Sequence, residues 1–285
     1  MKVVLIAGLG RSGSTLLGAI LGQLEGAFFA GELFKTGLLV PAPDRCGCGL
    51  SLGECQVWRE ISARCDDLAA AQLTGADGTL RGLVHRRVSP AEFERPRAAF
   101  ADLFRTIGST TGCRVVVDSS KQPGYADFLR GVDGVDLRVV HLVRDPRAGA
   151  HSRLRSAERI GQPPPLSIPR VAVTWNLWNL AVEALWRRGP YLRLRYEDFA
   201  ADPVGAAERI AAFAEVPYAG VRFTAPNVVH LAPTHSVAGN RSRFLTGEIE
   251  IRLDDEWRSS PRLTARDRRT IDAITWPVRR RYGYG

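Results

Sequence analysis

The stretch Val3–Thr15, VVLIAGLGRSGST, decides the fold of this 285-residue chain. Val3–Ala7 is a short, continuous apolar run rich in β-branched residues, which is typical of a buried parallel strand. Gly8–Gly13 is a glycine-rich turn, and from Ser14 to Leu24 the apolar residues recur at helical spacing. A strand, a glycine turn and a helix in this order open a doubly wound α/β fold, so we expect three layers with a central parallel sheet flanked by helices.

The alternation of strand and helix recurs along the chain. A second strand is expected just before Glu32. Further strands are expected at Arg114–Asp118, Leu137–Val143 and Tyr191–Arg195, with helices after them near Tyr125–Arg130, Pro146–Ser156 and Pro203–Ala214. This order favours a parallel sheet with right-handed crossovers. We find no repeat and expect one domain, 1–285, with long insertions.

Two insertions carry no recognised motif for a substrate. Residues 36–97 contain a cysteine cluster, and we expect them to form a lid or a wall of the substrate pocket. Residues 156–169 are rich in proline, and we expect a mobile loop there that also contacts substrate.

Composition sets limits on the function. The formal net charge is +9, from 39 basic and 30 acidic residues, and 36 of the basic residues are arginine. This excess favours polyanionic ligands only weakly, but it singles out Lys121 because lysine is rare in the chain. No apolar run has the length of a membrane span, and five cysteines fit a reducing compartment, so we expect a cytoplasmic protein.

Gly8–Thr15 has the frame of a phosphate-binding P-loop, G-x4-G followed by Ser14 and Thr15. Backbone amides at such a helix N-terminus cradle an anionic phosphate. Ser14 stands where the ATP-binding motif requires lysine, and the nearest cation is Arg11, which argues against ordinary ATP hydrolysis. The alternative is a P-loop-like turn that binds nothing.

A second anion site is expected around Arg144. This residue ends a strand, and Ser152 lies eight residues later on the following helix. Two helical turns bring the serine hydroxyl back toward the strand end, where it and an arginine fork can share one phosphate. Alternatively, Arg144 and Asp145 form a simple surface ion pair.

These two motifs resemble those of PAPS-dependent sulfotransferases. The resemblance implies that the loop holds the 5′-phosphosulfate of PAPS and that the Arg-(x7)-Ser pair, Arg144 and Ser152, holds its 3′-phosphate. The loop residues concerned are Arg11, Ser12, Gly13, Ser14 and Thr15. The RDPR form at residues 144–147 resembles the carbohydrate-acting and bacterial branches of the family.

Two further blocks resemble the same family. In Leu194–Phe199, LRYEDF, the resemblance implies that Tyr196 flanks the adenine with its aromatic face, although it could equally be a core tyrosine. Gly239–Phe244 resembles the segment GN-x-x-R-F that closes over the 3′-phosphate. The residues concerned there are Asn240, Arg241 and Arg243. Arg243 is the favoured contact, because the family usually has proline at the position of Arg241.

The implied reaction moves a sulfuryl group in line from PAPS to an acceptor hydroxyl or amine. We expect Glu32 to be the base, because it follows a strand at the carboxyl edge of the sheet, where open α/β folds bind ligands. Lys121 and Arg11 would stabilise the leaving phosphate, with Asp118 holding Lys121 or Ser119 in place. No metal is then required. A histidine is the alternative base, although His141, His151 and His235 are interpreted as mainly structural.

The cysteines form the pattern C-x-C-x6-C. Cys46, Cys48 and Cys55 make this pattern, and Cys65 follows ten residues later. The sequence leaves open free thiols, a disulfide and a zinc site, since C-x-C is tighter than the usual zinc knuckle.

Two other functions compete with sulfuryl transfer. A P-loop kinase with a degenerate ATP-binding loop would use Asp118 or Asp145 to bind magnesium. A nucleic-acid-binding protein would use an arginine-rich surface such as Arg266–Arg281, but the arginines are scattered among acidic residues. We expect a small-molecule or carbohydrate acceptor, such as a carbohydrate, glycolipid or natural product, and no nucleic-acid partner. The sequence leaves the oligomeric state open.

Overall fold

Five parallel strands form the main sheet of the protein. The computed structural model describes residues 1–35, 45–71, 73, 80–164 and 166–285. The strands are β1 (Lys2–Ala7), β2 (Ala27–Gly31), β3 (Val115–Lys121), β4 (Asp136–Val143) and β5 (Tyr191–Arg195). Their order is β2-β3-β1-β4-β5, with every pair parallel. The predicted central parallel sheet is confirmed, and the apolar run that opens the chain lies in its middle.

β3 extends further than the sequence indicated. The strand was expected to end at Asp118, but it continues through Lys121, because β3 resumes its pairing with β1 at Ala7 and Lys121 after a register shift. The polar side chains are buried there because they find partners; the Ser119 hydroxyl donates to the Gly31 carbonyl at 3.1 Å. Lys121 is therefore fixed by the sheet rather than by a loop.

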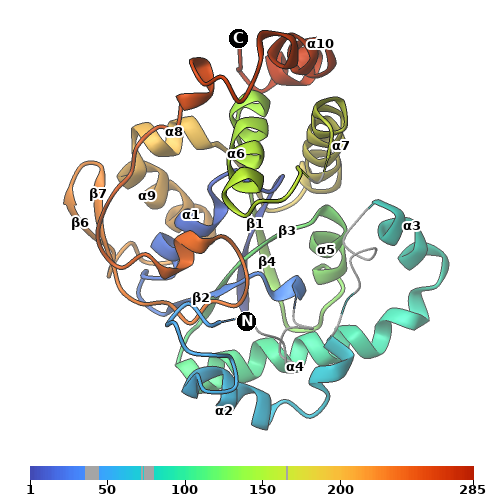
Figure 1. The fold of residues 1–285 in the computed structure, drawn as a ribbon. Helices are drawn as coiled ribbons and strands as arrows, with labels where there is room; N and C mark the ends of the chain where they lie inside the picture. Colours follow the sequence, from blue (N-terminus) through green and yellow to red (C-terminus); the bar gives the residue numbers. More distant parts are fainter. Residues whose placement is uncertain (36–44, 72, 74–79, 165) are drawn as a thin grey trace.

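Helices cover both faces of this sheet (Figure 1). They are α1 (Ser14–Leu21), α2 (Gln56–Arg64), α3 (Leu80–Val88), α4 (Glu94–Thr111), α5 (Pro123–Leu129), α6 (Pro146–Arg159), α7 (Ile168–Trp186), α8 (Tyr196–Ala201), α9 (Pro203–Ala214) and α10 (Ala265–Arg281). Val3 and Leu5 of β1 pack in one buried cluster with α4, α5 and α7, whereas Val4 and Ile6 pack in another with α1 and α9. This alternation follows from the two-residue period of a strand and gives the predicted three layers.

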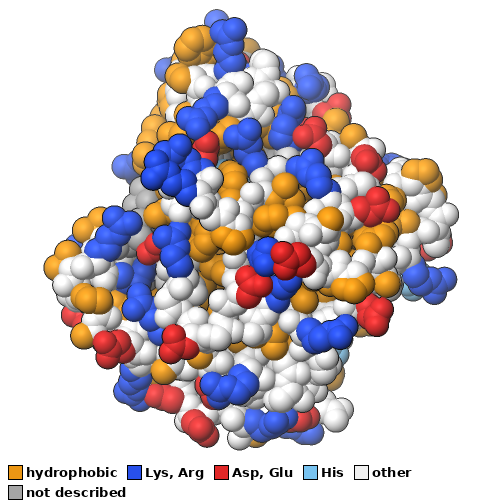
Figure 2. All heavy atoms as spheres, turned by 180° about the vertical axis from the view of Figure 1, so that it is seen from behind, with side chains coloured by type: hydrophobic (Ala, Val, Ile, Leu, Met, Phe, Trp, Pro, Cys, Tyr) orange, Lys and Arg blue, Asp and Glu red, His pale blue; other side chains and the backbone are white. Residues whose placement is uncertain are grey.

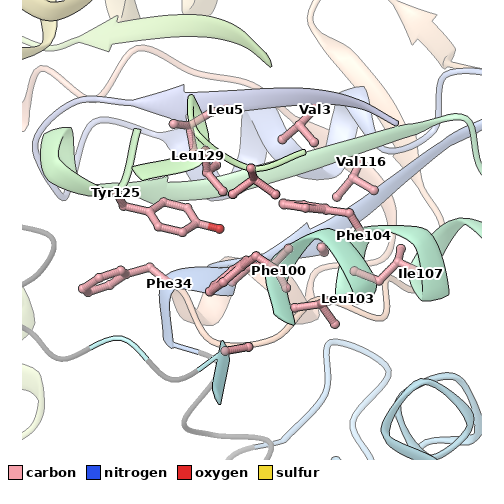
Figure 3. Packing of buried hydrophobic residues seen from close by; sticks show 14 of the residues in the cluster. Val3, Leu5, Phe34, Phe100, Leu103, Phe104, Ile107, Val116, Tyr125 and Leu129 are labelled. Carbon is pink, nitrogen blue, oxygen red and sulfur yellow. The ribbon is translucent and has the colours of Figure 1, made fainter. Parts of the chain in front are cut away.

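An aromatic cluster fills the first of these faces (Figure 3). Phe100 of α4 lies 5.7 Å from Tyr125 and 5.3 Å from Phe128, both on α5, measured between ring centroids. Phe34 packs edge-on against Tyr125 at 5.6 Å. Aromatic pairs in such arrangements add to the stability gained by burial. The cluster anchors the chain two residues after Glu32 and so fixes where that carboxylate lies.

The loop expected at residues 156–169 is shorter in the structure. Helix α6 continues through Arg159, and α7 already begins at Ile168. The prolines misled the prediction because Pro169 stands in the first turn of α7, where its missing N–H costs no helical hydrogen bond. Residue 165 of this connection lies outside the described residues.

A second sheet was not predicted. Strands β6 (Arg222–Ala225), β7 (Val228–Leu231) and β8 (Gly247–Glu250) form an antiparallel sheet of order β6-β7-β8 beside α9 (Figure 1). After β7 the chain returns to the main sheet, where Val237 bridges to Gly31 at the end of β2. The C-terminal third of the chain thereby reaches the carboxyl edge of the main sheet.

The described part of the insertion at 36–97 forms helices that pack beneath the sheet. Trp58 and Ile61 of α2 are fully buried in the cluster that contains α4. Residues 36–44, 72 and 74–79, which the prediction of a lid includes, lie outside the described residues.

The described helices include none with both the length and the apolar composition needed to cross a membrane.

Candidate active site

A cavity of about 580 Å³ opens at the carboxyl ends of β1, β3 and β4. Six cationic side chains and two carboxylates line it among the described residues. The cations are Arg11, Lys35, Lys121, Arg144, Arg153 and Arg155, and the carboxylates are Glu32 and Asp254. The excess of positive charge in a concave site at this edge of an α/β sheet favours an anionic ligand.

The P-loop forms one wall of this cavity. Gly13 has a φ of 94°, and a Cβ on it would lie 2.7 Å from the Tyr196 ring, so only glycine fits there. Ser12 and Ser14 are buried, and within the described structure the Ser12 hydroxyl has no hydrogen-bond partner. Arg11 lies beside this wall and donates to the Ser156 hydroxyl of α6 at 2.5 Å. The loop thus lines the cavity at the start of α1 through Arg11, Gly13, Ser14 and Thr15, whereas Ser12 is not among the described lining residues.

Glu32 also lines the cavity, directly after β2. One of its carboxylate oxygens accepts from the Lys121 ammonium, and the other lies 2.9 Å from the Lys35 ammonium. Lys121 also donates to the Ser119 carbonyl at 2.8 Å and has a left-handed backbone conformation, with a φ of 66°. This backbone conformation is uncommon for a residue other than glycine. The structure brings together the predicted base and the predicted cation.

Opposing effects act on the ionisation of this pair. Burial disfavours the charge of Glu32, but the ammonium groups of Lys121 and Lys35 outweigh it and hold its pKa below the usual range. Burial lowers the pKa of Lys121, and the Glu32 carboxylate partly offsets this effect. Glu32 is therefore ionised at neutral pH, which is the form that a base requires.

Asp118 does not hold Lys121 or Ser119 as predicted. It is fully buried and binds the Ser120 amide and the Tyr125 hydroxyl, each at 2.8 Å. Burial raises its pKa to about 6, although these hydrogen bonds oppose the shift. The prediction failed because alternate residues of a strand face opposite sides, and the strand continues through this segment.

Arg144 follows β4 and reaches the other end of the cavity. Its guanidinium lies 2.9 Å from the Asp254 carboxylate, donates to the Arg11 carbonyl at 3.1 Å, and stacks over the Tyr196 ring at 4.3 Å. Arg155 of α6 binds the same Asp254 carboxylate at 2.7 Å. The alternative, a surface ion pair with Asp145, does not form, because Asp145 caps α6 and pairs with Arg147 instead.

Ser152 and Tyr196 both line this end of the cavity. Ser152 lies on α6, as the two-turn spacing predicted. The Tyr196 ring packs against Gly13, and its hydroxyl donates to the Arg252 carbonyl at 3.2 Å. The predicted pair Arg144 and Ser152 thus faces the same cavity as the P-loop.

The segment Gly239–Phe244 contributes differently from the prediction. Gly239, Asn240 and Ser242 line the cavity. The backbone N–H of Asn240 donates to the Thr15 hydroxyl at 3.3 Å. Arg243 is buried and donates to the carbonyls of Gly239 and Arg45, each at 3.0 Å, and Arg241 is exposed. Neither arginine is among the described residues that line the cavity, because the short helix of residues 241–244 directs the polar contacts through Asn240.

The histidines considered as alternative bases lie elsewhere. His141 is fully buried between Tyr191 and Asn179, with each ring nitrogen 2.8 Å from its partner, and burial lowers its pKa to about 4. His151 is buried and His235 lies beside the cysteines. None of the three histidines is among the described residues that line the cavity. Glu32 does line it and binds Lys121, so it is the better placed candidate for the base.

Sequence reasoning missed four charged residues of the cavity. Lys35, Arg153, Arg155 and Asp254 all line it. Arg153 and Arg155 closely follow Ser152 on the helix that was already identified, so their position near Ser152 could have indicated that they line the cavity. Asp254 lies in an irregular segment after β8, and no periodicity or motif marks it.

A parallel sheet with a cationic cavity at its carboxyl edge places the protein among the α/β enzymes. Residues 82–220 match the model of the sulfotransferase family. The sulfotransferase domain of the Synechococcus PCC 7002 olefin synthase is 21% identical, with a TM-score of 0.58 over 100% of this chain and 95% of that one. The sulfotransferase domain of the curacin biosynthetic pathway is 17% identical, with a TM-score of 0.53 over 99% and 97%.

A third solved structure with this fold is the sulfotransferase STF9 from Mycobacterium avium. It is 12% identical, with a TM-score of 0.50 over 99% of this chain and 77% of that one. A search of the curated proteins finds no significant match. The family model and the shared fold together support a sulfotransferase, an enzyme that transfers sulfuryl groups. The resemblance inferred from the motifs is confirmed for the family and the fold.

Proposed function

We propose that the protein transfers the sulfuryl group of PAPS to a hydroxyl or amine of a small acceptor. The observation that carries this proposal is one cavity with two anion-binding walls. The P-loop forms one wall, Arg144 and Ser152 form the other, and six cationic side chains face only two carboxylates among the described lining residues. PAPS carries negative charge at two separated positions, its 5′-phosphosulfate and its 3′-phosphate, which fits this arrangement.

Buried polar atoms in these walls lack partners that such a ligand would supply. Among the described residues that line the cavity, these atoms are the Nε–H groups of Arg144 and Arg153. Buried polar groups are normally hydrogen-bonded, so unpartnered ones facing a cavity support a polar ligand. We assign Arg11, Ser12, Gly13, Ser14 and Thr15 to the 5′-phosphosulfate, and Arg144 and Ser152 to the 3′-phosphate.

The remaining contacts to the nucleotide are assigned by position. Tyr196 lies between the two walls, where its ring can flank the adenine. Asn240 borders the P-loop through Thr15, whereas Arg243 supports the segment from behind through its bonds to backbone carbonyls. We therefore assign Asn240 to the cavity and give Arg243 and Arg241 no direct contact with the nucleotide.

The chemistry uses the Glu32–Lys121 pair. When bound, PAPS supplies the sulfuryl group and leaves as PAP. Glu32 accepts the proton of the acceptor hydroxyl or amine, and its lowered pKa keeps it ionised and ready to do so. Lys121 and Arg11 provide positive charge for the leaving phosphate. Lys121 is assigned to both sides of the reaction because its ammonium binds Glu32 and lines the same cavity as the P-loop.

The acceptor is proposed to be a carbohydrate, a glycolipid or another hydroxylated natural product. The RDPR sequence at residues 144–147 supports this class through its resemblance to carbohydrate-acting and bacterial members. Two structural neighbours are domains of an olefin synthase and of the curacin biosynthetic pathway, which favours a natural product. None of the described residues of 36–97 and 156–169 lines the cavity, so we do not assign these insertions to the acceptor pocket.

The kinase alternative is less well supported. It requires a carboxylate at a strand end that faces the phosphates and binds magnesium. Asp118 is fully buried against Ser120 and Tyr125, and Asp145 is engaged by Arg147, so neither candidate faces the cavity. Ser14 also leaves the P-loop without the lysine of an ATP site.

The nucleic-acid alternative requires cations gathered on one surface. Figure 2 shows lysine and arginine side chains dispersed over the visible face, with acidic side chains between them. Within Arg266–Arg281, several arginines already have internal partners; Arg279 lies 3.5 Å from Asp272, and Arg281 binds Glu183. This distribution supports a solvated surface rather than a binding site for a polyanionic chain.

A comparison of ligands by thermal shift tests the proposal. PAP, AMP without a 3′-phosphate, and ATP with magnesium are each added to the purified chain. A ligand at a hundred times its dissociation constant stabilises the protein by about 2.7 kcal/mol. We expect a large shift with PAP and little with the other two. A shift with magnesium and ATP but none with PAP would overturn the proposal in favour of the kinase.

A further inference from the structure

Three cysteines and a histidine converge at a site that the sulfuryl-transfer chemistry does not use. Cys46, Cys48, Cys55 and His235 each offer one ligand atom, and these atoms all lie within 4.8 Å of one another. His235 Nδ1 is 3.3 Å from the Cys55 sulfur and 3.8 Å from the Cys46 sulfur. Cys65, the fourth cysteine of the sequence pattern, is not in this group.

The spacing of these atoms matches one metal in particular. Tetrahedral zinc binds sulfur at about 2.3 Å and imidazole nitrogen at about 2.0–2.1 Å, so its ligand atoms lie roughly 3.5–3.8 Å apart. Three thiolates and an imidazole form a common structural zinc set, and soft sulfur ligands disfavour magnesium and calcium. We propose that Cys46, Cys48, Cys55 and His235 form a structural zinc site.

The surrounding backbone holds the ligands in this arrangement. Cys46 and Cys48 lie in a tight turn, in which the Cys46 amide donates to the Leu50 carbonyl and the Gly49 amide donates to the Cys46 carbonyl, each at 2.8 Å. The indole of Trp58 donates to the His235 carbonyl. These hydrogen bonds hold the turn that contains Cys46 and Cys48 and the segment that contains His235 without the help of a metal. Residues around known metal sites orient the ligands in the same way.

Gly47 brings the two segments into contact. Its amide donates to the Ser236 carbonyl at 2.9 Å, and a Cβ on it would lie 2.4 Å from the Thr234 hydroxyl. Any larger residue would separate the turn from the segment that contains His235. The glycine between the two cysteines is therefore a requirement of the tight C-x-C spacing.

The site joins the insertion to the segment that borders the active site. Two residues after His235, the Val237 amide donates to the Ala30 carbonyl and the Glu32 amide donates to the Val237 carbonyl, each at 2.8 Å. Four protein ligands leave no open position on the metal, so the zinc would position this segment rather than take part in the reaction.

Metal analysis of the full chain tests the proposal. The protein is produced with added zinc, purified with a non-chelating reductant, and measured by inductively coupled plasma mass spectrometry. We expect one zinc ion per chain, released when a mercurial reagent blocks the thiols. Cys55→Ser and His235→Gln should lose the zinc. Cys65→Ser is the matched control and should keep it, because Cys65 is half-buried outside the cluster.

Two measurements keep the test decisive if a variant fails to fold. Cys48→Ser alters a half-buried ligand, and wild-type protein can be loaded with cobalt, which gives the absorption of a tetrahedral thiolate complex. Folded, reduced wild-type protein that binds neither metal stoichiometrically would overturn the proposal. So would a disulfide among the three cysteines in freshly purified protein, or equal zinc loss in Cys65→Ser. None of these readouts depends on PAP binding, so they are independent of the proposed function.

Discussion

The two ends of the cavity each hold a carboxylate against cations, but they are built differently. Glu32 and Lys121 follow or end strands of the main sheet, and their side chains are 8% and 13% exposed. Arg144 also follows a strand and is 8% exposed, but its partner Asp254 comes from an irregular segment and is 22% exposed. In the first pair both residues are held by strands of the main sheet, whereas in the second pair only Arg144 is.

This difference indicates different roles for the two carboxylates. Glu32 must keep its place relative to the reacting atoms, and the sheet and the aromatic cluster around Phe34 hold it there. Asp254 occupies the cations that we assign to a phosphate, so nucleotide binding would displace it. We therefore propose that the first carboxylate takes part in the chemistry and that the second occupies the phosphate site in the free protein.

The largest effect is expected from Glu32→Ala. Loss of a general base lowers turnover by about 10²–10⁴-fold. The affinity for PAP should change little, because Glu32 belongs to the sulfuryl end of the cavity. Turnover and calorimetric PAP binding check both statements, with Glu32→Gln as the variant that keeps the shape. Normal turnover in either variant would place the base elsewhere.

Lys121→Met should lower turnover by about 10²–10³-fold, the range for removing one group that stabilises developing charge. It should also move the acidic limb of the kcat/KM profile to higher pH. Lys121 lowers the pKa of Glu32, so without it Glu32 binds its proton more tightly and needs a higher pH to act as a base. Lys35→Met is the control, with a similar but smaller shift and little loss of rate. If the acidic limb did not shift in Lys121→Met, Lys121 would not control the ionisation of Glu32.

Arg144→Ala should weaken PAP binding by about 1.5–3 kcal/mol, the range for a hydrogen bond to a charged group. AMP lacks the 3′-phosphate, so its affinity should be nearly unchanged. Calorimetric titration of both nucleotides measures the difference. If both affinities fell equally, Arg144 would support the cavity in general rather than bind the 3′-phosphate.

Asp254→Asn is expected to have the smallest effect and the opposite sign. Removing the competing carboxylate should strengthen PAP binding by about 0.2–1 kcal/mol, the range for a partly exposed ion pair. Asp255→Asn, one residue away, is the matched control and should bind PAP like the wild type. Weaker binding in Asp254→Asn would mean that this carboxylate helps to build the site.

The sequence was a good guide to the main sheet and a poorer one to its surroundings. The strands of the parallel sheet contain short apolar or alternating patterns, so all five could be placed from the sequence, and Tyr191–Arg195 was predicted without error. The strands of the second sheet are four residues long and partly exposed, which gives too short a pattern to detect. The extension of β3 was missed because its last residues are polar.

The candidate site shows the same division. The P-loop, Glu32, Lys121, Arg144 and Ser152 lie at ends of regular elements, so motifs and spacing predicted that they would meet. Asp254 and the contact of His235 with the cysteines depend on where the chain returns after long irregular segments. Local sequence patterns do not show which distant segments come into contact. The cysteine spacing alone therefore suggested Cys65, rather than His235, as the fourth ligand of a metal.

The position of β1 also governs the order in which the protein can fold during synthesis. Val3 pairs with Val116 in β3 and with Leu137 in β4, so the central strand leaves the ribosome about 110 residues before either neighbour. Such distant pairings close slowly, and an apolar strand that waits for its partners can aggregate. Because Val237 and Asp254 come later still, the cavity takes its final shape only after most of the chain has been translated.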